Sequence, residues 1–147
     1  MFSQTVEYAL RAAVSLAATP DTPQTSEQVA ERTLVPRGYL SKVLQQLVKA
    51  NLIRSQRGLH GGFTLVRSPD RVTILEVINA VDPIRRIQEC PLGLEAHSDE
   101  LCPLHRRLDD ALASIEEAFG QTTLAEVVSE PSKSQPLCNL TVEGNSG

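Results

Sequence analysis

The chain has 147 residues, 41% of them hydrophobic, and a formal net charge of −4, so it is long enough for one compact domain with its own core. No apolar run approaches the roughly 18 residues that cross a membrane, and the N-terminus lacks the basic and apolar regions of a signal peptide. Three cysteines, an odd number, do not suggest a secreted disulfide framework. A bacterial cytoplasmic protein is therefore expected.

Positive charge is concentrated in the N-terminal half of the chain. Residues 1–67 carry eight Lys and Arg against four Asp and Glu, whereas residues 68–147 carry six against fourteen. The stretch 37–67 has no acidic residue and six basic ones: Arg37, Lys42, Lys49, Arg54, Arg57 and Arg67. Any single lysine is most simply a solvated surface charge, but a stretch of this composition favours a phosphate-bearing partner.

The first two predicted elements are helices. Apolar residues recur at helical spacing over residues 3–18, where Glu7 and Arg11 are four apart and suited to pair. Prolines in the segment 19–24 end this helix. Thr25 and Gln28 form a capping-box pattern that opens a second, short helix. That helix is expected to bury Val29, Ala30 and Leu34.

A third helix is predicted over residues 36–50 and follows the second after a tight turn. Its apolar side is expected to bury Leu40, Val43, Leu44, Leu47 and Val48. Its outward side presents Arg37, Gly38, Tyr39, Ser41, Lys42, Gln45 and Lys49. This pattern is typical of a DNA-binding helix-turn-helix, although the spacing alone also fits an ordinary helical hairpin.

A hairpin is predicted directly after the third helix. Residues 52–56 and 63–66 have strand character, and the glycine-rich segment RGLHGG between them favours a loop. A hairpin in this place is the wing of a winged helix, with Arg57 at its base and His60 near its tip positioned for a minor groove. The side chains expected to contact phosphates are those of Lys42, Lys49, Arg54 and Arg67.

The C-terminal half predicts five further features. Thr73 and Glu76 open a helix over residues 73–81. A loop, 84–103, contains Cys90, His97 and Cys102. A long helix, 104–119, has an apolar seam suited to a helix–helix contact and is expected to end at Gly120. A short helix follows Thr123, and residues 129–147 have the composition of a disordered tail.

These residues carry a resemblance. The segments VEYALRAAVSLA, VPRGYLSKVLQQLVKANLI, RGLHGGFTL, VTILEVINAVD and TLAEVV are similar to those of the IscR/NsrR-type family of bacterial winged-helix regulators, over about residues 1–128. The resemblance implies a mainly α fold with a small β-hairpin: a winged helix-turn-helix at 1–67, a sensor loop and dimerisation helices at 68–128, then the tail. It also implies a homodimer that acts as a repressor and binds a near-palindromic double-stranded DNA operator.

By the same resemblance, the start of the recognition helix and the wing loop contact DNA. The positions that match are Arg37, Gly38, Tyr39, Ser41, Lys42, Arg57, His60 and Gly61. No nucleophile–base arrangement, phosphate loop or carboxylate pair indicates an enzyme. A winged helix used only for contact with another protein is the alternative, and the acid-free stretch 37–67 argues against it.

The resemblance also suggests a metal site in the loop, matched only in part. Cys90 and Cys102 match the first and third cysteines of cluster-binding relatives, but Ala96 occupies the middle position. His105 matches a histidine ligand of one branch, Glu7 a carboxylate that another branch takes from the partner subunit, and His97 is in reserve. This set suits a 2Fe–2S cluster, or less well zinc or iron. A Cys90–Cys102 thiol switch, or control by a protein partner without a cofactor, stays open.

Overall fold

The computed structural model describes residues 2–95, 100–134 and 136–137. Its helices and strands, in chain order, are α1 (Gln4–Ala18), α2 (Ser26–Thr33), α3 (Arg37–Lys49), β1 (Ile53–Gln56), β2 (Gly62–Leu65), a 3-10 turn η1 (Pro69–Arg71), α4 (Ile74–Val81), α5 (Pro103–Gln121) and α6 (Leu124–Ser129). The fold is therefore mainly helical with one antiparallel hairpin, as predicted. No helix in the described part of the chain is long and apolar enough to cross a membrane.

Helix starts follow the predicted capping chemistry. In α2 the Thr25 hydroxyl accepts from the Gln28 N–H while the Gln28 side chain accepts from the Thr25 N–H, and Thr73 with Glu76 repeats the arrangement in α4. After the C-terminal end of α3, Asn51 has a φ of 60° and stops the helix in a left-handed turn, a conformation that asparagine tolerates better than most residues.

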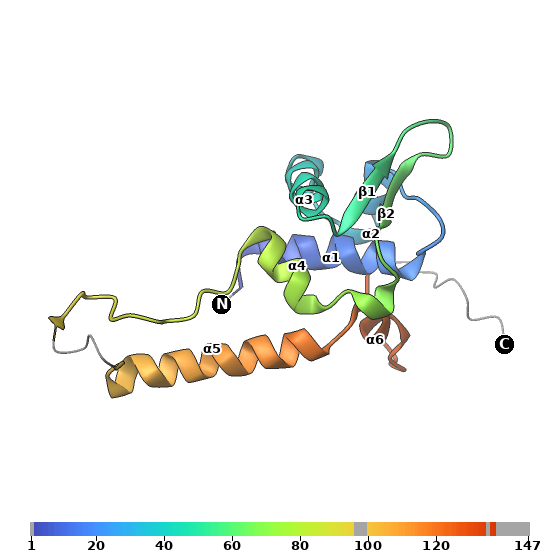
Figure 1. Cartoon of the computed structure of the whole chain (residues 1–147). Coiled ribbons are helices and arrows are strands. Elements are labelled where there is room, and N and C mark those ends of the chain that lie inside the picture. The colour runs from blue at the N-terminus through green and yellow to red at the C-terminus, as the bar shows by residue number, and fades with distance from the viewer. Residues whose placement is uncertain (1, 96–99, 135, 138–147) are drawn as a thin grey trace.

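Helix α1 is the centre of the core. It lies between α3 and the hairpin on one side and α4, α5 and α6 on the other (Figure 1). Its buried alanines let neighbouring helices approach closely, and leucines from α3 and α6 pack around them. The same cluster includes Val72, Ile74, Val77 and Ile78, so α4 shares one hydrophobic core with the winged helix.

The hairpin is tied to the core through Gln24. This side chain is buried and hydrogen-bonds Ser15 and Thr19 on α1. Its backbone pairs with Phe63 of β2 by two hydrogen bonds, of 3.1 and 2.7 Å. The approach is so close that a Cβ on Gly62, whose φ is 144°, would lie 2.5 Å from the Gln24 carbonyl oxygen. Only glycine fits there without displacing the backbone.

Three expectations about individual residues are wrong. Leu34 is 67% exposed because it adopts a left-handed φ of 57° at the end of α2, and Thr33 is buried in its place. Val48 is 38% exposed because it lies at the edge between the core side of α3 and the hairpin. Gly120 does not end α5: the helix continues to Gln121 and stops where Thr123 bridges to Thr73.

Helix α5 lies at the margin of the core, against which only the partly buried Phe119, near its C-terminal end, packs among its described residues. It has nineteen residues, all of them described, and none is buried. The preceding loop runs out beside it and is held by Arg86, which bonds Asp109 at 2.7 and 2.8 Å and Glu116 at 3.1 Å (Figure 1). The hydrogen bonds from Arg86, with a further one from the Ile87 N–H, lower the pKa of Asp109 to about 2.

Candidate nucleic-acid interface and cysteine loop

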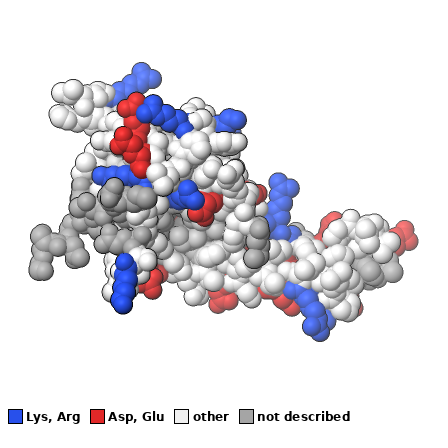
Figure 2. Space-filling view, turned by 180° about the vertical axis from the view of Figure 1, so that it is seen from behind, with Lys and Arg blue, Asp and Glu red and all other residues white. Residues whose placement is uncertain are grey.

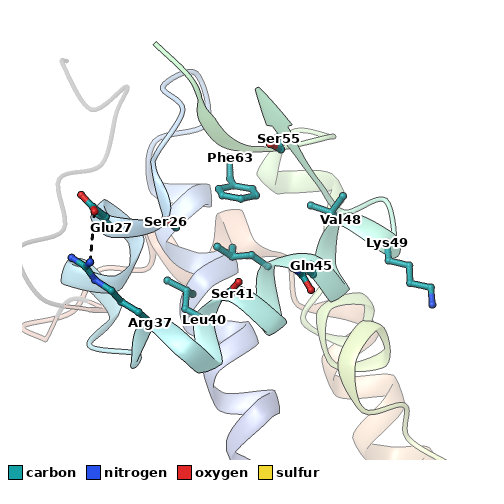
Figure 3. Close-up of a pocket in the computed structure, with 11 residues that line it drawn as sticks. Ser26, Glu27, Arg37, Leu40, Ser41, Gln45, Val48, Lys49, Ser55 and Phe63 are labelled. Carbon is teal, nitrogen blue, oxygen red and sulfur yellow. Dashed lines mark ion pairs between the residues drawn. The ribbon is translucent and has the colours of Figure 1, made fainter. Parts of the chain in front are cut away.

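A cleft of about 560 Å³ separates α3 from the hairpin, which we call the wing (β1, β2 and the loop between them). One wall is the exposed side of α3 and the other is formed by Ser55 and Phe63 of the wing (Figure 3). Leu40 and Leu44 form its apolar floor. We call this feature the α3–wing cleft. Both α3 and the wing lie on the same side of α1 (Figure 1).

Two basic side chains, Arg37 and Lys49, line the α3–wing cleft. Lys49 points outward at one end, and Arg37 at the other forms an ion pair with Glu27 at 3.6 Å (Figure 3). Both members of that pair are about 70% exposed, so solvent screens it and a phosphate can compete for Arg37. Figure 2 shows Lys and Arg side chains over the end of the molecule that carries the wing, with some acidic groups among them. The exposed predicted DNA contacts there also include Ser41, Lys42, Arg54, Arg57 and His60.

Among the other predicted contact residues, Arg67 and Tyr39 have contacts within the chain that stabilise the fold. The Arg67 guanidinium bonds Glu76 at 3.0 Å and the Arg71 carbonyl oxygen, so it fixes the end of the wing to α4. Tyr39 packs its ring on Tyr8 of α1, with centroids 5.8 Å apart, and therefore stabilises the start of α3 from the side. The role of Arg67 toward phosphate stays a prediction.

The glycines of this region differ in what the fold requires of them. A Cβ at Gly61 would lie 2.4 Å from the Gln56 carbonyl oxygen, so the wing loop itself requires glycine there. A Cβ at Gly38 would meet nothing within 4 Å, and its φ is not positive. Glycine in a helix costs about 0.5–1 kcal/mol relative to alanine. The folded chain alone therefore gives no reason for glycine at position 38.

The structure brings together two of the predicted metal ligands. Cys102 is the N-cap of α5, and its Sγ lies 3.3 Å from Nδ1 of His105 one turn later. Cys90 is half-buried in the preceding loop. Glu7 lies on α1, where it bonds Arg11 at 3.0 Å. In the described ranges, no three His, Cys, Asp or Glu side chains are grouped to hold a metal ion. Ala96, His97 and Cys138 lie outside those ranges.

Comparison with known proteins identifies the family. Residues 2–130 match the family model Rrf2, described as an iron-dependent transcriptional regulator. The chain belongs to the Rrf2 family. It is therefore a DNA-binding transcriptional regulator, as its sequence resemblance implied, and not an enzyme.

A sequence relative and two solved structures support this assignment. A helix-turn-helix transcriptional regulator of Aquifex aeolicus (strain VF5) is 30% identical over 131 residues, covering 87% of this chain and 91% of that protein. The structure of CymR, the global cysteine regulator of B. subtilis, superposes with a TM-score of 0.75 at 25% identity, over 90% of this chain and 98% of that one. T. potens IscR has a TM-score of 0.74 at 22% identity, over 91% and 93%, and shows the shared fold.

Sequence reasoning missed residues whose roles depend on long-range packing. Gln24 has no periodicity signal, yet it connects α1 to the wing. Val48 was assigned to the core and lines the cleft instead. Gln45 was assigned to the outward side of α3 but was not among the expected DNA contacts. A helical projection of α3 would have shown Gln45 between Gly38 and Lys49 on the exposed side.

Proposed function

We propose that this Rrf2-family protein is a homodimeric, sequence-specific repressor that binds its operator through the α3–wing cleft. The observation that carries the proposal is the α3–wing cleft itself, bordered by exposed basic side chains on a protein whose net charge is −4. Residues 1–67 supply the DNA contacts, and residues 68–128 supply the loop and the dimer helix. In this arrangement α3 enters a major groove and Arg57 reaches the adjacent minor groove.

The homodimer is supported by the unburied helix α5. Its apolar residues Leu104 and Leu108 are 62% and 48% exposed. Farther along α5, Leu112 and Ile115 line a small cavity of about 240 Å³ beside Phe2 and Val6. A helix of nineteen residues, roughly 28 Å long, with an apolar side and no buried residue needs a second surface. A second copy of α5 supplies one with the same seam.

We propose the cysteine loop as the sensor, with Cys102 and His105 at its centre. A thiol and an imidazole 3.3 Å apart can exchange a proton or share a metal ion. Arg86 lies four residues before Cys90, and its bonds to Asp109 hold this part of the loop against α5. A chemical change at the loop would thereby alter the placement of α5, and with it the spacing of the two winged helices.

An iron–sulfur cluster is not assembled by the described residues of one chain. A 2Fe–2S cluster takes four protein ligands, and Cys102 with His105 supplies two. Cys90 and Glu7 do not join them in a group of three or more in the parts of the chain described. A thiol switch needs fewer residues. Oxidation of Cys90 and Cys102 to a disulfide releases two protons and two electrons, and hydrogen peroxide accepts both and is reduced to two water molecules.

DNA binding is tested by fluorescence anisotropy with a labelled duplex of mixed sequence over a series of salt concentrations. The proposal predicts binding whose logarithmic association constant falls linearly with the logarithm of salt concentration. Absence of binding at low salt would contradict it.

The sensor is tested by anaerobic purification followed by visible absorption and by iron and sulfide analysis. Colour and iron that are lost in Cys102→Ala would establish a cluster. A colourless protein whose DNA binding changes with peroxide in the wild type, but not in Cys102→Ala, would establish the thiol switch. If neither oxidant nor cluster content alters DNA binding, the loop is not the sensor.

A further inference from the structure

Two side chains of α3 give the α3–wing cleft a chemistry that its basic rim does not explain. Gln45 and Val48 are three residues apart, on the same side of the helix, and both line the cleft with Ser41 (Figure 3). Gln45 is exposed and Val48 is 38% exposed. The cleft therefore presents a primary amide next to two methyl groups, at the surface that faces DNA in the proposed function.

Neither side chain belongs to the buried side of α3. In the described part of the structure, the Gln45 side chain is exposed and its amide forms no hydrogen bond within the chain. Val48 is β-branched, which is mildly unfavourable in a helix, and it is 38% exposed. The buried side of α3 is already complete with Leu40, Val43, Leu44 and Leu47. The side chains of Gln45 and Val48 can therefore contact a partner.

An A·T base pair matches this combination. In the major groove, adenine presents an acceptor at N7 and a donor at N6, which a glutamine amide satisfies together. Thymine presents a C5-methyl group, for which an apolar side chain is the complement. Guanine instead offers two acceptors, which suit Arg or Lys. The Ser41 hydroxyl can donate or accept and so discriminates less.

Two basic side chains lie on either side of Gln45 and Val48 and would position the DNA backbone. Lys49 lies one residue beyond Val48 and points away from the cleft floor, and Arg37 lies two turns before Gln45 at the other end (Figure 3). Phosphates held at these two positions would bring base edges toward the middle of α3. Phosphate contacts of this kind set register and affinity, whereas the groups between them set sequence preference.

We infer that Gln45 and Val48 recognise an A·T base pair in each operator half-site, Gln45 through the adenine edge and Val48 through the thymine methyl group. The inference rests on the proposed DNA-binding function and deepens it. It makes this pair of residues a source of sequence preference, separate from the basic residues that hold the backbone.

The experiment is selection of binding sites from a random-sequence duplex pool, with wild type, Gln45→Ala, Val48→Ala and Gln46→Ala. Gln46 is the matched control because it is an exposed glutamine on the same helix that does not line the cleft. Wild type and Gln46→Ala should enrich the same motif, with one strongly preferred A·T pair per half-site. Gln45→Ala should lose about tenfold or more of the preference at that pair alone.

Uracil in place of thymine at the preferred pair then tests Val48, because uracil lacks only the methyl group. Wild type should bind the uracil duplex about fourfold more weakly, the effect of one buried methyl group. Val48→Ala should bind both duplexes equally. Melting temperatures close to wild type confirm that the variants fold.

Different results would contradict base recognition by Gln45 and Val48 and DNA binding itself. A wild-type motif that Gln45→Ala retains unchanged, or a uracil duplex that binds wild type as tightly as thymine does, overturns the inference and leaves DNA binding in place. A wild-type protein that binds no duplex overturns the proposed function itself.

Discussion

The winged helix and the α5 arm, which is the loop 82–102 with α5, are built on opposite principles. The winged helix surrounds α1 with buried side chains, and even its projecting wing is anchored through Gln24 to the core. The α5 arm has no buried residue on its helix and is held to itself by the exposed ion pairs of Arg86. One region buries its apolar side chains within the chain, whereas the other leaves Leu104 and Leu108 exposed, and the proposed dimer would cover them.

The largest expected effect comes from the α5 arm. Replacing both Leu104 and Leu108 with glutamate places charges on the proposed dimer seam, so the molecular mass from light scattering should fall to that of a monomer. Operator affinity should fall at least a hundredfold, because two half-sites are then bound independently. Leu59→Glu on the wing tip, 95% exposed, is the control and should leave the mass unchanged. A double variant that remains dimeric would show that α5 is not the interface.

The next largest effect concerns the completeness of the winged helix. Gln24→Leu removes the hydrogen bonds to the Ser15 carbonyl and hydroxyl and to Thr19, and leaves those buried groups unsatisfied. We expect the free energy of unfolding to fall by about 2 kcal/mol or more. Chemical denaturation measures this change, and Gln45→Leu, at an exposed glutamine, is the matched control. Equal stability of the two variants would show that Gln24 does not anchor the wing.

Gly38 separates stability from binding within the winged helix. A methyl group there meets nothing in the folded chain, so Gly38→Ala should raise the free energy of unfolding by about 0.5–1 kcal/mol. Operator binding should weaken because the same methyl group would obstruct close approach of DNA. Thermal melting measures the change in stability, and anisotropy titration measures the change in operator affinity. A variant that is both more stable and fully able to bind would remove Gly38 from the interface.

The smallest effect is a pH step in the α5 arm. The bonds from Arg86 and the Ile87 N–H lower the pKa of Asp109 to about 2 from its ordinary value of 3.8. The contact therefore stabilises the loop fully above about pH 4 and is lost as pH falls through 2. NMR titration of the Asp109 carboxyl carbon measures the step, and Arg86→Ala should return its pKa toward 3.8. A wild-type pKa near 3.8 would mean that the contact between Arg86 and Asp109 does not form in solution.

Local signals in the sequence predicted most of the fold. The capping pairs Thr25–Gln28 and Thr73–Glu76 and the glycine loop of the wing each act over a few residues, and each is where it was expected. What failed depends on distant partners or on a single backbone angle. Leu34 turns outward because of its positive φ, and no local pattern shows that Gln24 pairs with Phe63.

The candidate site was predicted less completely than the fold. Basic composition was enough to propose the DNA-binding surface, because charge is visible in the sequence without packing. The α3–wing cleft between its two walls, and the side chains of Gln45 and Val48 in it, depend on how the wing packs against α3. The pairing of Cys102 with His105 was accessible from spacing, since residues three apart meet at the start of a helix.

The central claim is that the α3–wing face, and not another basic surface, holds DNA. The direct measurement is the salt dependence of duplex binding for wild type, Arg57→Ala and Arg107→Ala, the last an exposed arginine on α5 that removes the same charge. The account predicts that Arg57→Ala binds about tenfold or more weakly with a salt slope smaller by about one, while Arg107→Ala matches wild type. Equal losses in both variants would contradict it, because binding would then follow net charge alone.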